Sequence, residues 1–163
     1  MVQLTTPRRG GFTLIELMIT VAIVGILAKL AAPAMQQMIL AENVRSATSD
    51  LQTALYYTRS EAIKRASNVD IVPNSGDWKN GWVVQLSGGG AVLRQHDAVN
   101  TQLSSMAGGT ITYRSDGRVT STPGTIAVTT SNTSVQARCI KIDLSGRPNV
   151  NNYAFGGGTN TCS

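Results

Sequence analysis

Residue types that build catalytic and metal sites are scarce in this chain of 163 residues. It contains one histidine, His96, and two cysteines, Cys139 and Cys162. A structural zinc site needs four ligands, and nucleophilic catalysis needs a nucleophile beside a base, so neither site can be built from this set. The 9 acidic residues are scattered and show no pairing typical of a metal centre or a glycosidase. The sequence therefore predicts no metal, no cofactor and no enzymatic activity.

Aromatic residues (5%) and charged residues (14%) are also few, whereas Gly, Ser, Thr and Asn are abundant. This composition favours short strands joined by polar turns over a bundle of helices. Apolar residues make up 42% of the chain and are grouped, which excludes a disordered protein. The Gly88-Gly89-Gly90 triplet is not a phosphate loop, because no Lys-Ser or Lys-Thr follows it.

The longest apolar run lies near the N-terminus, at residues 12–30. As a helix it would be about 28 Å long, close to the thickness of the hydrocarbon core of a bilayer. The leader before it carries Arg8 and Arg9, which are expected to stay in the cytoplasm and to direct the rest of the chain outward. The small-residue step Gly10-Gly11 precedes the run, so cleavage there would leave the apolar helix on the mature protein. A plain signal anchor is the alternative.

One carboxylate, Glu16, lies inside this apolar run, where insertion costs about 2.5–3.5 kcal/mol. Lys29 is roughly 20 Å further along the helix and cannot neutralise it. Near the outer interface, Lys29 can instead extend its ammonium group toward water. We expect a new amino terminus at Phe12 of a neighbouring copy to be the positive partner of Glu16. The acidic residue thus turns a membrane anchor into an element that associates with other subunits.

Residues 35–66 contain no Gly or Pro and are predicted to continue the helix. Residues three or four apart form an apolar stripe that can pack on a head domain: Val44, Ala47, Leu51, Leu55, Thr58 and Ala62. Asn68 and Pro73 mark the end of the helix. Six strands are predicted after it, at 69–72, 82–86, 91–95, 110–113, 125–130 and 138–144.

Trp78 and Trp82 are expected to pack in the core or at an edge, because no basic-aromatic array accompanies them. In the last predicted strand, Ile140, Ile142 and Leu144 alternate on one face, so Cys139 points to the other. A returning tail could bring Cys162 to it. Two cysteines in a head outside the cytoplasm favour one disulfide.

The segment Gly11-Phe12-Thr13-Leu14-Ile15-Glu16 resembles the prepilin processing motif of type IV pilins and type II secretion pseudopilins. The resemblance implies that a prepilin peptidase cuts between Gly11 and Phe12 and methylates the new terminus. It also implies that Glu16 guides docking against the terminus of an adjacent subunit. Pro33 lies where such helices commonly have a proline, and would kink or locally open the helix. Lys29 departs from the usual apolar pattern.

The second half of the chain resembles the GspH/FimT group of minor pilins and pseudopilins, which includes FimU-like members. The matching residues are Trp78, Gly81-Trp82, Leu93-Arg94, Ser115-Asp116-Gly117-Arg118 and Ile142-Asp143-Leu144-Ser145-Gly146-Arg147. The implied fold is α+β: a long N-terminal helix packed against a small antiparallel β-sheet head, as in type IV pilins. The expected domains are a leader (1–11), a transmembrane and polymerisation helix (12–34), its amphipathic continuation (35–66) and a β-rich head (67–163).

The implied partners are other pilin subunits, the prepilin peptidase and an inner-membrane assembly platform. The expected location is the bacterial inner membrane with the head in the periplasm, and then a pilus or pseudopilus. We expect a minor pilin that primes or caps a type IV pilus. The alternatives are a minor pseudopilin of a type II secretion system and a minor pilin that binds double-stranded DNA during natural transformation. The cysteine pair favours a pilus subunit, because it resembles the C-terminal disulfides of pilins.

The transformation alternative depends on arginines in turns. DNA-binding FimT-like proteins share a Gly-Arg-x-Arg element near the C-terminus, whereas this chain has Gly146-Arg147-Pro148-Asn149. Asn149 can bond a phosphate but brings no charge. The candidate DNA contacts are Arg118, Arg138, Lys141 and Arg147, which would form one basic edge if their strands are neighbours.

Overall fold

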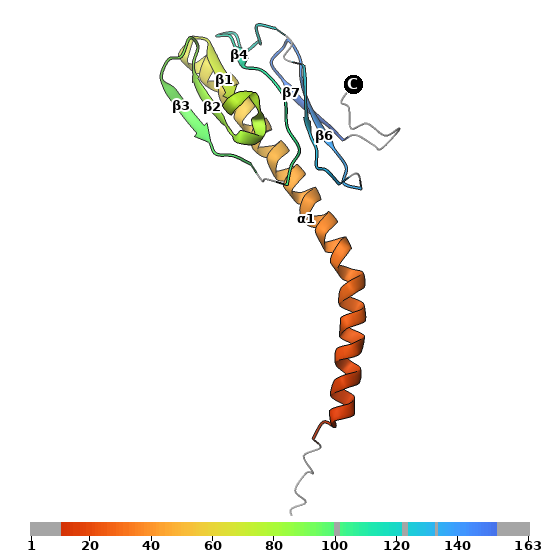
Figure 1. Cartoon of the computed structure of the whole chain (residues 1–163). Coiled ribbons are helices and arrows are strands. Elements are labelled where there is room, and N and C mark those ends of the chain that lie inside the picture. The colour runs from red at the N-terminus through yellow and green to blue at the C-terminus, as the bar shows by residue number, and fades with distance from the viewer. Residues whose placement is uncertain (1–10, 100–101, 122–123, 133, 153–163) are drawn as a thin grey trace, which may run out of the picture. The chain divides into compact units, whose positions relative to one another are not determined.

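One long helix, α1 (Leu14–Arg65), opens the computed structural model, which describes residues 11–99, 102–121, 124–132 and 134–152 (Figure 1). The predicted helix is therefore confirmed, with a start two residues later than Phe12 and an end one residue before Ala66. The chain divides into two compact units, residues 1–36 and 37–163, and each is described separately.

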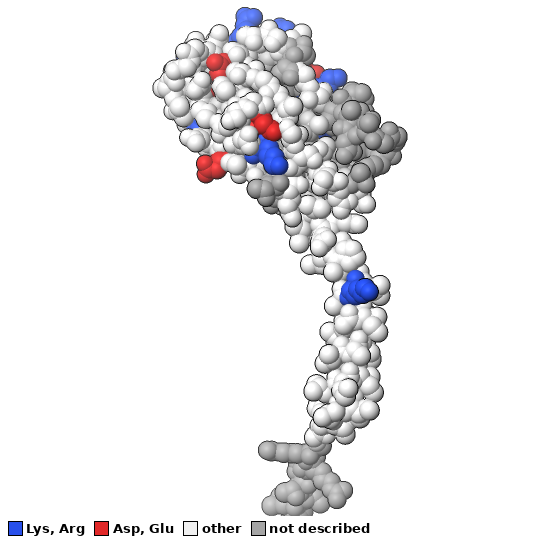
Figure 2. Space-filling model, viewed as in Figure 1, with Lys and Arg blue, Asp and Glu red and all other residues white. Residues whose placement is uncertain are grey.

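In the first unit, α1 presents apolar side chains on all sides, and none of the most apolar window is buried within the chain. This part is long and apolar enough to cross a membrane. Figure 2 shows it as an almost uncharged surface. The helix continues through Pro33 without interruption, so the local opening expected there is absent. The missing N–H of Pro33 still removes one bond to the carbonyl group four residues earlier.

In the second unit, α1 buries the predicted stripe, whose six members are all less than 9% exposed. Burial of the threonines in this stripe region is possible because their hydroxyl groups bond within the helix. Thr48 donates to the carbonyl of Val44 (2.6 Å), and Thr58 donates to that of Ala54 (2.7 Å). The stripe is therefore the face that α1 contributes to the core.

Among the described residues, seven strands follow α1 and form two antiparallel sheets. The first has the order β3-β2-β1-β4, and its strands are β1 (Val69–Pro73), β2 (Trp82–Leu86), β3 (Val92–His96) and β4 (Ile111–Tyr113). The second has the order β5-β6-β7, with β5 (Thr125–Val128), β6 (Arg138–Ile142) and β7 (Pro148–Asn152). The α+β, type IV pilin-like fold is confirmed.

All six predicted strands exist, but β7 was missed and β6 was predicted too long. β7 begins with a proline and has three asparagines, a composition that disfavours strands. The proline is tolerated because β7 is an edge strand and Pro148 is its first residue. β6 ends at Ile142 because Gly146 donates its amide to the carbonyl of Asp143 (2.8 Å) and closes a turn. Leu144 lies in that turn, outside the strand, and is half exposed, so its predicted place in the strand beside Ile140 and Ile142 was wrong.

The two tryptophans are fully buried, which confirms that they pack in the core. Trp82 lies 6.4 Å from Trp78 between ring centroids, and the ring of His96 stacks on Trp82 at 4.1 Å. The histidine thus serves as a packing partner on β3.

Asp77 connects two segments of the head. It lies between the short 3-10 helices η1 (Asn74–Gly76) and η2 (Trp78–Asn80). Its carboxylate accepts hydrogen bonds from the amides of Lys79 and Met106 (both 2.9 Å) and from the hydroxyl of Ser105 (2.6 Å). Partial burial alone would raise the pKa of Asp77, but these hydrogen bonds, with the nearby Lys79, lower it below its ordinary value.

Candidate functional site

The start of α1 is built around Thr13 and Glu16. Oε2 of Glu16 accepts hydrogen bonds from the backbone N of Thr13 (2.9 Å) and from its hydroxyl (3.0 Å). In return, the Thr13 hydroxyl oxygen accepts from the amide of Glu16 (3.3 Å). This reciprocal pair is a capping box, and it satisfies backbone groups that an open helix end would leave without partners.

Thr13 was missed by the sequence reasoning, which gave Glu16 no partner within its own chain. The Thr-x-x-Glu spacing immediately before an apolar run is itself the signal of a capping box and would have predicted it. Only one carboxylate oxygen is used, and Oε1 of Glu16 accepts no hydrogen bond among the described residues. Glu16 can therefore keep its bonds to Thr13 and still receive a cation from another copy.

The predicted processing step lies directly before this cap. Gly11 has no atoms within 4 Å of the position where a Cβ would be, and Phe12 is 91% exposed. The peptide bond between them is thus unobstructed by the part of the chain that the structure describes. The leader, residues 1–10, lies outside the described residues.

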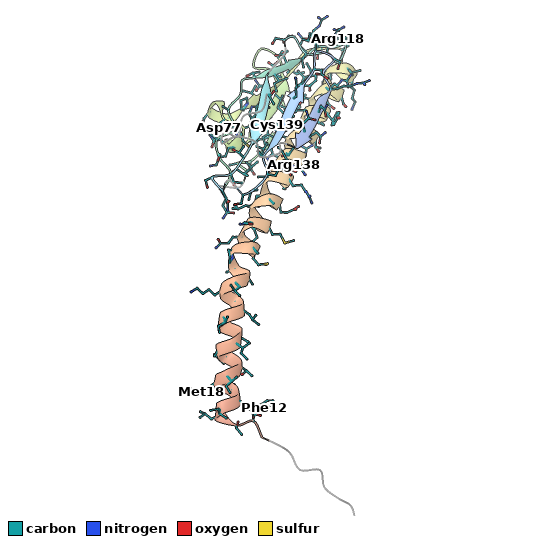
Figure 3. All side chains as sticks on the ribbon, turned by 90° about the vertical axis from the view of Figure 1, so that its right-hand side faces the viewer. Phe12, Met18, Asp77, Arg118, Arg138 and Cys139 are labelled. Carbon is teal, nitrogen blue, oxygen red and sulfur yellow. The ribbon has the colours of Figure 1, made fainter. Side chains whose placement is uncertain are left out.

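The four candidate DNA contacts do not form one edge, so this prediction was wrong. β6 begins at Arg138 and leads to the 143–147 turn, which lies against the 114–118 turn. A Cβ added to Gly146 would overlap the carbonyl oxygen of Gly117, so the two backbones touch. Arg118 and Arg147 follow these glycines directly. Figure 3 shows Arg118 and Arg138 toward opposite ends of the head.

Lys141 belongs with Arg118 and Arg147 rather than with Arg138. It pairs with Asn149 across the β6–β7 hairpin, close to the 143–147 turn. The last turn of α1 adds Lys64, because Ile63 and Arg59 pack against Gly117. We call Lys64, Arg118, Lys141 and Arg147 the basic end. None of the four side chains makes an ion pair with a described residue, and Figure 2 shows Lys and Arg side chains at this end of the head.

Most other charges near the basic end have partners, whereas the exposed Asp143 in the 143–147 turn makes no ion pair with a described residue. Arg65 bonds Glu61 (2.6 Å), Arg114 pairs with Asp116 (3.3 Å), and Nε of Arg59 donates to the carbonyl of Gly117 (2.9 Å). The hydroxyl of Tyr113 is buried beneath the turns and has no hydrogen-bond partner. Burial raises the pKa of Tyr113, so its hydroxyl stays neutral and offsets none of the positive charge. The basic end therefore keeps a net positive charge.

The predicted disulfide joins Cys139, which the structure describes, to Cys162, which it does not describe. Cys139 is buried on β6, on the face opposite Ile140 by strand alternation. Cys162 lies outside the described residues, so the pairing stays a prediction. Within the described ranges, no group of three or more His, Cys, Asp and Glu side chains could hold a metal ion.

Comparison with known proteins gives two family matches. The profile described as "Type II transport protein GspH" matches residues 47–146, and the "Prokaryotic N-terminal methylation motif" matches residues 6–28. The second match includes Gly11, Phe12 and Glu16, and it supports processing by a prepilin peptidase and association with other pilus subunits. A search of curated proteins found no match.

Two crystal structures of the type IV minor pilin FimU from Pseudomonas aeruginosa (strain PAO1) share the fold. The first, in space group P21, has a TM-score of 0.61 and 23% identity, and covers 68% of this chain and 89% of the FimU chain. The second, in space group P65, has a TM-score of 0.56 and 24% identity, with coverages of 66% and 91%. Because the GspH profile spans more than half of its residues behind a methylation motif, the chain belongs to the GspH family of minor pilins and pseudopilins, which are structural subunits and not enzymes.

Proposed function

We propose that the chain is a minor pilin that is incorporated into a type IV pilus and helps to initiate or cap it. The observation that carries this proposal is the start of α1, where a capped Glu16 with one unused carboxylate oxygen opens a helix whose apolar surface is uncovered. Both solved structures described above are of a type IV minor pilin, FimU.

The proposed sequence of events follows from these features. The subunit enters the inner membrane with its head in the periplasm, and the prepilin peptidase cleaves between Gly11 and Phe12. The new ammonium group of one subunit then approaches Oε1 of Glu16 on a neighbour, while Thr13 holds Oε2. In a low-dielectric environment such a pair is strongly favoured over two separate charges. The assembly platform would move the paired subunits into the fibre, with Pro33 lending the helix a point of weaker backbone bonding.

The test is Glu16→Ala in cells that carry the filament system. We expect the variant to be cleaved and held in the membrane but absent from sheared filaments. Thr20→Ala is the matched control, because Thr20 lies in the same apolar segment and its hydroxyl bonds the carbonyl of Leu17 in its own helix (2.8 Å). Normal incorporation of Glu16→Ala would refute the assembly role of the carboxylate.

A pseudopilin of a type II secretion system is the alternative that the family match also allows. The proposed Cys139–Cys162 disulfide favours the pilus, because it resembles the C-terminal disulfides of pilins. Loss of secreted enzymes with intact pili in a deletion strain would favour the pseudopilin instead.

DNA binding is a second candidate function, and the basic end is the observation that favours it. Two turns and a hairpin bring Arg118, Lys141 and Arg147 to the same end of the head, where their charges are unpaired. Phosphate groups of duplex DNA are natural partners for such a cluster.

The DNA test uses the full chain in detergent and a mobility shift of duplex DNA at low and moderate salt. We expect retention that weakens with salt, and a salt slope that falls by about one unit in Arg147→Gln. Lys79→Gln, on η2, is the control. Absence of binding at low salt, or indifference to Arg147→Gln, would exclude Arg147 as a contact.

A further inference from the structure

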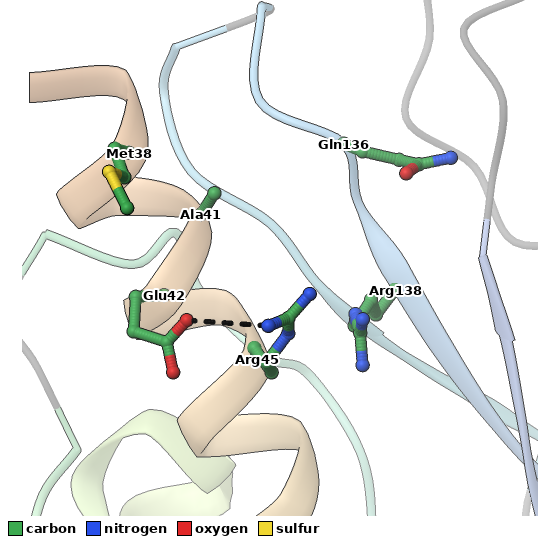
Figure 4. Close-up of a pocket in the computed structure, with 6 residues that line it drawn as sticks. All are labelled: Met38, Ala41, Glu42, Arg45, Gln136 and Arg138. Atoms are coloured by element: carbon green, nitrogen blue, oxygen red, sulfur yellow. Dashed lines mark ion pairs between the residues drawn. The ribbon is translucent and has the colours of Figure 1, made fainter. Parts of the chain in front are cut away.

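A hollow beside α1 in the second unit carries more positive than negative charge. It has a volume of about 260 Å³ and is lined by Met38, Ala41, Glu42, Arg45, Gln136 and Arg138 (Figure 4). We call it the basic hollow. Its four helix residues are three or four positions apart and share one face of α1, whereas Gln136 and Arg138 come from the start of β6 and the residues before it. Arg138 therefore belongs to this hollow and not to the basic end.

The two guanidinium groups of the basic hollow have little to neutralise them. Nη1 of Arg45 and Oε2 of Glu42 are 3.7 Å apart, and the two side chains are 65% and 68% exposed, so this pair is weak. Arg138 makes no ion pair with a described residue. Figure 4 shows the guanidinium groups of Arg45 and Arg138 next to each other. Two arginines against one glutamate leave a net charge of +1, and an anion between the arginines would relieve their repulsion.

A phosphodiester has the chemistry that this lining requires. A guanidinium group can donate two parallel hydrogen bonds to phosphate oxygens, and Arg45 and Arg138 supply two such groups from different elements. The exposed amide of Gln136 adds a further donor. A phosphodiester also carries a single negative charge, which matches the net charge of the lining.

The apolar part of the basic hollow favours a lipid over a free phosphate or a nucleic acid. Met38 is 72% exposed, Ala41 is also exposed, and both line the hollow beside the arginines. The neighbouring Ile39 is 51% exposed. Such side chains gain nothing from a phosphate alone, but they can cover the methylene groups that follow a lipid headgroup, and a methionine adapts readily to them.

The position of the basic hollow along α1 favours the same ligand. The predicted span ends at residue 34, and Met38 follows about one turn later in an uninterrupted helix. At 1.5 Å per residue this is about 6 Å beyond the span, and the headgroup layer on each side of a bilayer is about 5–7 Å thick. Long side chains of a helix point back toward its N-terminus, so Arg45 extends toward this layer.

We propose that the basic hollow binds the headgroup of an anionic phospholipid in the periplasmic leaflet of the inner membrane. Arg45 and Arg138 hold the phosphate, and Met38 and Ala41 contact the start of the acyl chains. The inference rests on the membrane-bound stage of the proposed function. The bound lipid would hold the head against the bilayer surface until the subunit leaves the membrane.

The test measures the lipid that the full-length protein retains. The protein is purified in mild detergent, mixed with phosphatidylglycerol or with phosphatidylcholine, and analysed by native mass spectrometry. We expect phosphatidylglycerol to be retained in preference, and Arg45→Gln and Arg138→Gln each to lower its retention about fivefold. Lys141→Gln is the matched control, because it removes the same charge from the same strand outside the hollow, and it should retain the lipid as the wild type does.

Glycerol phosphate, which lacks acyl chains, separates a lipid from a free phosphate as the ligand. At equal concentration we expect it not to displace phosphatidylglycerol, and we expect Met38→Ser to lower lipid retention about threefold. Equal retention of the two lipids, displacement by glycerol phosphate, or an equal fall in Lys141→Gln would overturn the proposal. If an arginine variant does not accumulate, the lipid preference of the wild type and the loss in Met38→Ser decide.

Incorporation into sheared filaments is scored for the same variants. Wild-type incorporation without any lipid preference refutes the lipid site and leaves the proposed function intact. Unchanged lipid retention in Arg138→Gln together with reduced incorporation would assign the hollow to an acidic segment of another pilin, and would also overturn the proposal.

Discussion

Thr13 shows how one hydroxyl can serve both helix formation and assembly. Its bonds to Glu16 fix the carboxylate at the first turn of α1 and leave Oε1 unused. Without them, the side chain of Glu16 would sample several rotamers, and pairing with another subunit would have to order it first.

We therefore expect Thr13→Ala to destabilise the first turn of α1 by about 1 kcal/mol. Hydrogen exchange in detergent should show the amides of residues 14–17 exchanging about fivefold faster than in the wild type. Thr13→Ser retains the hydroxyl and should exchange at the wild-type rate. Equal protection in Thr13→Ala would show that the cap contributes nothing to this helix end.

Gly146 joins the two turns of the basic end, and its conformation leaves no room for a side chain. Its φ is 75°, in the left-handed region, and an added Cβ would overlap the carbonyl oxygen of Gly117. Gly146→Ala should therefore lower the free energy of unfolding by more than about 2 kcal/mol, as measured by urea denaturation in detergent.

Gly124 is the matched control for Gly146. It has a similar φ of 73° but nothing within 4 Å of its Cβ position. Gly124→Ala should lower the free energy of unfolding only by the cost of placing alanine in the left-handed region, about 1 kcal/mol. Equal losses in the two variants would mean that the contact between the turns adds nothing to stability.

At the scale of elements, periodicity predicted most of the fold. The stripe from Val44 to Ala62 repeats every three or four residues and is buried as expected, because a helix has only one face toward the core. β7 could not be predicted, since its sequence has little strand propensity and it exists through pairing with β6.

The candidate site was predictable only in part, and for a similar reason. Residues close in sequence, such as Gly11, Phe12 and Glu16, stay close in space whatever the fold of the rest of the chain. Arg118 and Arg147 are brought together by contact between turns of different sheets, and Arg138 is separated from them by the direction of β6. Sequence spacing alone carries no information on either arrangement.

Asp77 provides a prediction at this scale, because its carboxylate ties η2 to the segment around Met106. The folded pKa of Asp77 is below its ordinary value of 3.8. The stabilisation is therefore complete above pH 3.8 and is lost as the pH falls through the lower folded value. Asp77→Asn should lower the free energy of unfolding by about 1–2 kcal/mol at pH 7, as measured by urea denaturation.

The difference between Asp77→Asn and the wild type should shrink as the pH falls below 3.8, because protonation then weakens the same bonds in the wild type. A difference that stays constant down to the acid-unfolding region would show that these bonds do not depend on the charge of Asp77.

At the scale of the whole molecule, one deletion strain separates the functional alternatives. We expect loss of surface pili and of twitching motility, with secretion of enzymes unchanged. DNA uptake would fall together with the pili, so complementation is needed to separate a defect in pilus assembly from a defect in DNA binding. Arg147→Gln should restore pili and leave DNA uptake reduced if the basic end binds DNA. Full DNA uptake in this variant would show that Arg147 does not contribute to uptake by binding DNA.

The uncovered apolar surface of α1 also affects the free-energy change when the helix moves from the membrane into a fibre. Lipid tails and the helices of neighbouring pilins are similarly apolar, so replacing one by the other releases little water and gives almost no hydrophobic driving force. The balance then depends on the few polar groups of the segment, Glu16 and Lys29, and on packing between side chains. The apolar surface itself would therefore add little to the free energy of extraction, so the work of an assembly motor would go mainly into the polar groups and the packing.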